Sequence, residues 1–95
     1  MTESNEYKDV INFLAGTFHQ DIEDPTDALQ EYIKEVGSEW LLHISDEIER
    51  FLMSEMSEQC KEEFIKENTC IYFPAIGMKP IVWLKNVLEE IRISI

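Results

Sequence analysis

Apolar side chains recur at intervals of three and four residues along most of this chain, and that spacing sets its fold class. The first series begins at Tyr7 and ends at Phe18, and four further series follow, the last one after Pro80. Residues at this spacing lie on one face of a helix, because an α-helix turns once every 3.6 residues. The sequence therefore predicts an all-α protein of about five helices, with residues 1–95 forming a single domain.

Capping signals predict where the first two helices begin and end. The first helix is predicted over about residues 5–18. Asp24 followed by Pro25 is typical of a helix start, because the Asp side chain accepts from free backbone N–H groups and proline lacks a donor that would be unsatisfied there. Gly37 is expected to end the second helix in the left-handed conformation.

Similar signals divide the rest of the chain. Ser38 is predicted to cap the third helix and Ser57 the fourth, which ends near Asn68, and Pro80 opens the last helix. Residues 69–76 are rich in β-branched and aromatic side chains, but the sequence offers them no partner strand. An extended connector is therefore predicted there, with a short strand as the alternative.

The helical series also predict the core. A chain of this length buries one modest core without disulfides or metal, so Cys60 and Cys70 are expected to be free thiols. The predicted core residues are Phe13, Leu14, Phe18, Leu29, Ile33, Ile44, Ile48, Phe51, Phe64, Trp83, Leu84, Val87 and Leu88.

The charge of the chain excludes several classes of partner. Its 8 basic and 20 acidic residues give a formal net charge of −12. Nucleic-acid binding needs a Lys or Arg for each phosphate contact, and anionic membranes attract basic segments, so neither is an expected partner. No apolar run approaches the ~20 residues of a membrane span, and the N-terminus lacks the basic and apolar regions of a signal peptide. The expected location is therefore the cytoplasm.

The acidic residues are concentrated in one part of the chain. Eighteen of the 20 precede Asn68, together with five of the 8 basic residues. On helices with polar outer faces such carboxylates are usually solvated surface. The excess here is greater than solubility alone requires, so a binding role for the acidic helix faces is the alternative. Trp40 lies one position before the series that begins at Leu41. It belongs either at the edge of the core or on the surface as an anchor for a partner.

The chain offers few groups that suggest catalysis. His19 and Asp21 resemble a general base with its orienting group, but successive helix positions point about 100° apart, so the two side chains do not naturally face each other. A small hydrolase using them is the least favoured function, and no catalytic residue is predicted. His19 and His43 lack the spacing of metal ligands, and no Gly-rich phosphate loop is present, so neither a metal nor a cofactor is expected.

Several short strings along the chain resemble a known family, the immunity proteins of bacterial contact-dependent growth inhibition systems. The resemblance runs from about residue 10 to residue 92. The matching strings are Phe13-Leu14, Thr17-Phe18-His19-Gln20-Asp21, Asp27-Ala28-Leu29, Glu47-Ile48, Leu52, Tyr72-x-Pro74, Gly77 and Trp83-Leu84.

The resemblance implies a stoichiometric inhibitor that binds the C-terminal domain of a toxin and has no enzymatic activity. A basic nuclease, with a ribonuclease favoured, suits the acidic charge of the chain, and a monomer in a 1:1 complex is expected. The acidic faces of the second and third helices are the expected contact. The residues predicted to bind the toxin are Asp21, Glu23, Asp24, Asp27, Glu31, Glu35, Glu39, Trp40, Asp46 and Glu47. An acidic helical adaptor or regulator that binds another basic protein remains the alternative.

Overall fold

The computed structural model describes residues 7–19 and 24–95, and it forms six helices and no strand within those ranges. The all-α prediction is confirmed. No helix in this part of the chain combines the length and the apolar character needed to cross a membrane. The helices are α1 (Lys8–Thr17), α2 (Pro25–Glu35), α3 (Ser38–Leu52), α4 (Glu58–Asn68), α5 (Phe73–Ile76) and α6 (Pro80–Ser94).

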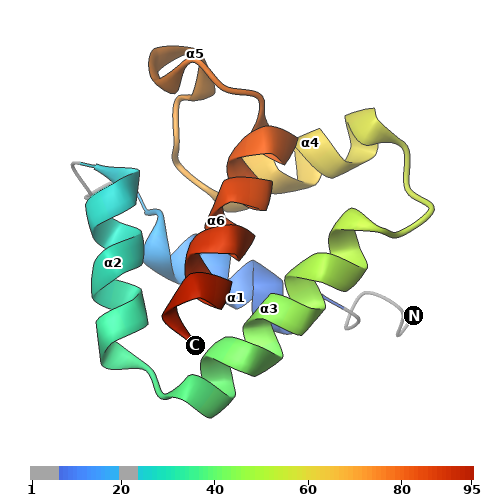
Figure 1. The fold of residues 1–95 in the computed structure, drawn as a ribbon. Helices are drawn as coiled ribbons and strands as arrows, with labels where there is room; N and C mark the ends of the chain where they lie inside the picture. Colours follow the sequence, from blue (N-terminus) through green and yellow to red (C-terminus); the bar gives the residue numbers. More distant parts are fainter. Residues whose placement is uncertain (1–6, 20–23) are drawn as a thin grey trace.

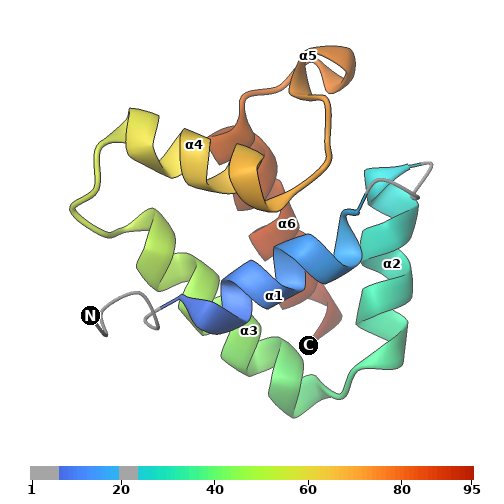
Figure 2. The same cartoon turned by 180° about the vertical axis from the view of Figure 1, so that it is seen from behind.

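Helices α1 and α6 occupy the middle of the molecule. The two opposite views place α6 in front of α1 in Figure 1 and α1 in front of α6 in Figure 2, with α2, α3 and α4 arranged around them. Both central helices pack against α3 and α4, and both also contact α2. The side chains of every longer helix can therefore meet in one place.

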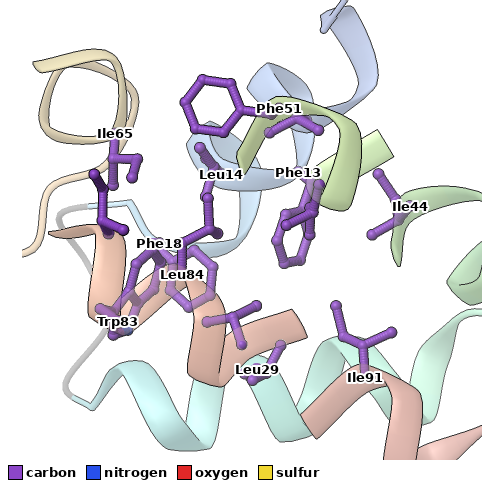
Figure 3. Packing of buried hydrophobic residues seen from close by; sticks show 14 of the residues in the cluster. Phe13, Leu14, Phe18, Leu29, Ile44, Phe51, Ile65, Trp83, Leu84 and Ile91 are labelled. Atoms are coloured by element: carbon purple, nitrogen blue, oxygen red, sulfur yellow. The ribbon is translucent and has the colours of Figure 1, made fainter. Parts of the chain in front are cut away.

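The core between these helices is apolar and rich in aromatic rings. The Phe18 ring, from the end of α1, meets the Trp83 ring of α6 edge to face, with ring centroids 4.9 Å apart. Trp83 also contacts Phe73 of α5, at 5.5 Å between centroids. Figure 3 shows Phe18, Trp83 and Leu84 next to one another, with Ile65 of α4 nearby. Direct side-chain packing thus joins the end of α1 to α5 and α6, which lie far from it in the sequence.

Two of the predicted helix caps are confirmed. The Asp24 carboxylate accepts a hydrogen bond from the Thr26 backbone N–H at 2.9 Å, and Pro25 is the first residue of α2. The Ser57 hydroxyl accepts from the Cys60 backbone N–H at 3.1 Å, at the start of α4. Both caps use the backbone donors that the first turn of a helix leaves unpaired.

The predicted join between α2 and α3 is wrong in detail. Gly37 has a φ of −78° and is not left-handed, while Val36 ends α2 in an extended conformation. Ser38 is the first residue of α3, and Gly37 stands at the N-cap without a side-chain hydrogen bond. An extended residue ends a helix as effectively as a left-handed one, so this joint does not depend on the conformational freedom of glycine.

The segment predicted as a connector contains a short helix. Thr69 and Tyr72 are extended, and the Cys70 N–H donates to the Phe18 carbonyl at 2.8 Å, but no strand forms in residues 69–72. Helix α5 then follows and ends at Gly77, whose φ of 68° lies in the left-handed region that glycine adopts without strain. The extra helix brings Phe73 into the core.

Most of the predicted core residues are buried, with differences at the helix edges. Ile33, Phe64 and Leu88 are only partly buried and pack against the core from its margin. The hydrophobic core also contains six buried side chains that the prediction left out: Val10, Leu41, Ile65, Phe73, Ile81 and Ile91. On α4 Ile65 is fully buried, whereas its neighbour Phe64 lies at the margin of the core. The buried face of that helix is therefore rotated by one position from the predicted face.

Replacing Trp83 by Ala is expected to lower the free energy of unfolding by about 3–5 kcal/mol, because it removes a buried indole and leaves a cavity. Trp83 is 6% exposed and contacts both Phe18 and Phe73. Val82 lies beside it on α6 and is exposed, so Val82→Ala is the control and should cost less than about 1 kcal/mol. Urea denaturation measures both, and a loss below about 1 kcal/mol for Trp83→Ala would contradict the packing described here.

Candidate functional site

Three carboxylates form a continuous row on the outer side of α2. Asp27, Glu31 and Glu35 follow one another at intervals of four residues, and all three are exposed. Leu29, on the inner side of the helix, is buried in the core. Because side chains four residues apart lie one above the other on a helix, these three make a single row. We call Asp27, Glu31 and Glu35 the acidic ridge.

Further acidic residues extend this charge at both ends of α2. Asp24 is exposed at the N-cap, and Glu39 is exposed in the first turn of α3. Between residues 24 and 40 there are five carboxylates and one basic residue, Lys34. The predicted contact residues Asp21 and Glu23 belong to the loop before α2 and lie outside the described residues.

Trp40 lies where α2 meets α3, and it is held in place while partly exposed. Its indole N–H donates to the Tyr32 hydroxyl of α2 at 2.8 Å, and its ring centroid is 4.9 Å from that of His43. The Tyr32 ring in turn contacts Phe13 of the core. With 43% of Trp40 exposed, the side chain packs on residues that border the core and also presents an aromatic surface to solvent. Its role as an anchor for a partner stays a prediction.

Tyr32 supports Trp40 as a neutral phenol. Burial raises the pKa of Tyr32 above its ordinary value. The hydrogen bond from Trp40 lowers this pKa, and the nearby Asp9 carboxylate raises it, so that the net shift is upward. The phenol oxygen is therefore an uncharged acceptor for the indole N–H at neutral pH. The sequence alone does not indicate the bond between Tyr32 and Trp40, because this bond depends on how α2 and α3 meet.

The two remaining acidic residues predicted on α3 have partners within the protein. Glu47 is only 4% exposed, and its carboxylate accepts a hydrogen bond from the Val10 backbone N–H at 2.8 Å. Asp46 is exposed, but it lies 3.8 Å from the Arg92 guanidinium of α6, which also bonds to Glu49. Glu47 thus has a structural role, and Arg92 partly balances the charge of Asp46.

Glu47 supplies the cap that α1 lacks from its own sequence. The N-cap residue Tyr7 makes no side-chain capping bond, and Val10 is in the first turn of α1. A carboxylate at a helix N-terminus pairs with an unsatisfied N–H group and interacts favourably with the helix dipole. The carboxylate comes from α3, so this contact fixes how α1 lies across α3.

His43 joins the same polar cluster. Its Nε2 atom is 2.8 Å from the Asp9 carboxylate of α1 and 3.8 Å from Glu47, four residues later on α3. One ligand atom from each of Asp9, His43 and Glu47 lies within 4.8 Å of the others, a grouping with the residue types of a divalent-metal site. These side chains already bond to one another or to Val10, and such bonds account for the cluster without an ion. The spacing of His43 and Glu47 was the only sign of it in the sequence.

The described residues thus form a small helical protein with an exposed acidic surface on α2 and at the start of α3. A model of the family described as CdiI immunity protein matches residues 6–91, nearly the whole chain. The chain therefore belongs to the CdiI immunity protein family, and the resemblance stated from its sequence is confirmed. No curated protein and no solved structure matches it.

Membership of this family supplies the broad role of the chain. An immunity protein neutralises a toxin, and proteins of this kind act in general without enzymatic activity. The partner that this membership implies is a toxin protein.

Replacing Glu47 by Ala is expected to lower the free energy of unfolding by about 1–3 kcal/mol, because the buried Val10 N–H loses its acceptor. Glu47→Gln should cost less, since the amide oxygen can still accept that bond. Glu63 is exposed in the middle of α4 and provides the control, for which Glu63→Ala should stay within about 0.5 kcal/mol of the parent. Urea denaturation gives all three values, and an Ala variant at Glu47 as stable as the parent would show that this cap contributes nothing.

Proposed function

We propose that this chain binds and neutralises the C-terminal toxin domain of a contact-dependent growth inhibition system, as a monomer in a 1:1 complex. The toxin domain is a basic nuclease, with a ribonuclease favoured. The inhibitor acts in the cytoplasm by binding to the surface of the toxin domain, without catalysis and without contacting nucleic acid. The observation that carries the proposal is the exposed acidic ridge, because no ion pair within the described residues joins Asp27, Glu31 or Glu35 to a basic side chain.

The charge of this surface matches the requirement of a nuclease. An enzyme that cleaves RNA or DNA needs a positively charged cleft to hold the phosphate backbone. A protein carrying a net charge of −12 is attracted to such a cleft over distances longer than direct contact. This attraction raises the association rate, and fast capture protects the cell that makes the toxin.

The contact is centred on α2 and the start of α3. Its exposed described members are Asp24, Asp27, Glu31, Glu35, Glu39 and Trp40. Asp21 and Glu23, in the loop before α2, remain part of the proposed contact by their position in the sequence. Asp46 contributes at the margin, because Arg92 partly balances it. Glu47 serves the fold and does not take part in the contact, because its carboxylate is buried against α1.

Trp40 supplies the short-range part of the same contact. Interfaces gain much of their affinity from a few aromatic or arginine residues near the centre. The Trp40 ring is fixed by its bond to Tyr32 before any partner arrives, so little conformational entropy is lost on binding. The acidic residues around it attract the partner, and the indole then packs against it.

Reversing the charge of Asp24, Asp27 and Glu31 together, each to Lys, is expected to slow association with the cognate toxin domain by at least about tenfold. The salt dependence of the association rate should also weaken, because screening shortens the Debye length from ~10 Å at 0.1 M to ~3 Å at 1 M. Stopped-flow association across that range and a growth-protection assay measure both effects.

The matched control reverses Glu58, Glu63 and Glu67 on α4, which are exposed and carry the same total charge. A control variant that slows association as much as the α2 variant would show that net charge alone matters. An α2 variant that protects cells and associates like the parent would show that the acidic ridge is only solvated surface.

Replacing Trp40 by Ala is expected to weaken toxin binding by about 2 kcal/mol or more, mainly through faster dissociation, because it removes the aromatic anchor. Leu42→Ala is the control, since Leu42 lies two positions further along α3 and is 52% exposed. Surface plasmon resonance gives the dissociation rates, and thermal unfolding shows whether each variant is folded. Equal dissociation rates for the Trp40 variant and the parent would remove Trp40 from the interface.

A further inference from the structure

A pocket of about 320 Å³ lies between the first half of α2 and the middle of α6. Its floor is apolar and comes from the buried side chains of Leu29, Trp83 and Val87. Figure 1 shows the two helices that form its walls. This volume is at the lower end of the range for ligand pockets (about 300–1,000 Å³), a size that suits one side chain of a partner better than a cofactor.

The rim of this pocket carries negative charge. Glu89 and Glu90 of α6 both line it and are exposed, and no Lys or Arg is found among the lining residues in the described part of the chain. The Gln30 side-chain amide of α2 donates to the Glu90 carboxylate at 3.3 Å and so orients it across the opening. An apolar floor under two carboxylates matches a side chain with an apolar stem and a cationic end.

The start of α2 does not turn this pocket into an anion site. Pro25 and Thr26 line it, and backbone N–H groups at a helix N-terminus ordinarily attract anions. Pro25 has no N–H to offer, however, and the Thr26 N–H already donates to the Asp24 carboxylate. The Asp24 carboxylate thus occupies the position at the start of α2 where an anion would otherwise bind. The remaining charge at the pocket is the negative charge of Glu89 and Glu90.

We propose that this pocket receives an arginine side chain of the toxin domain. The inference rests on the proposed function and names a second point of contact beside the acidic ridge. The arginine stem packs on Leu29 and Val87, and its guanidinium reaches Glu89 and Glu90 at the rim. Arginine fits better than lysine, because its planar group pairs with two carboxylate oxygens at once, stacks on aromatic rings such as Trp83 and is less strongly hydrated.

The experiment uses the full chain and its purified cognate toxin domain. Two variants alter the pocket: Glu89→Gln with Glu90→Gln removes its charge and keeps the acceptor for Gln30, and Asn86→Trp places a bulky ring at its exposed edge. The control is Glu63→Gln with Glu67→Gln, which removes the same charge from the exposed side of α4. Thermal unfolding of each variant shows that it is folded.

Both pocket variants are expected to raise the dissociation constant at least about tenfold through faster dissociation, and the control by less than about threefold through slower association. A double-mutant cycle then pairs the charge variant with Arg→Ala changes in the toxin domain. One such change should weaken binding to the parent and have no further effect against the charge variant.

Other outcomes overturn the inference in distinguishable ways. If the parent binds the toxin tightly and both pocket variants bind equally well, the pocket is outside the interface, and the proposed function stands. If only Asn86→Trp weakens binding, the occupant is apolar and no arginine enters. If the parent neither binds nor neutralises the toxin domain, the proposed function fails, and the pocket inference fails with it.

Discussion

The edge-to-face contact between Phe18 and Trp83 joins two unlike halves of this protein. One half holds almost all of the acidic residues, and the other, from Asn68 onward, is nearly neutral and mostly apolar. Trp83 also packs on Phe73, and the backbone N–H of Cys70 bonds to the Phe18 carbonyl, so both halves close around the same rings. With the neutral half providing α6 at the centre, the acidic helices need only one buried face each, and their other faces remain free to carry charge.

Those parts of the fold that depend on local sequence could be predicted, and those that depend on distant contacts could not. Apolar spacing locates the longer helices because it follows from helix geometry alone, and Asp24 and Ser57 cap within their own first turns. Helix α5 has four residues, too few to show a period, and it is buried through Phe73 against Trp83. Likewise, nothing near Gly37 in the sequence distinguishes an extended end of α2 from a left-handed one.

The same distinction applies to the candidate site. The acidic ridge could be predicted as exposed, because burying Leu29 fixes how α2 is turned. Asp46 and Glu47 look equivalent in the sequence, yet one is exposed beside Arg92 and the other is buried against the start of α1. Only the crossing of α1 over α3 separates them. A carboxylate next to a helix lacking its own cap is a signal that could have identified Glu47, but only once the neighbouring helix was known.

Helix α2 brings together the long-range and short-range parts of the contact that we propose. Tyr32 faces Trp40 and Phe13, whereas Gln30 faces Glu90 across the pocket, and the acidic ridge runs along the outer side. The charge attracts any basic protein over about a Debye length, so it cannot by itself select one toxin. Selection among basic partners has to come from shape at close contact, which is the role we propose for Trp40 and the pocket. Leu29 is the only buried residue of α2, and five of the eleven residues of this helix, the acidic ridge among them, are exposed to solvent.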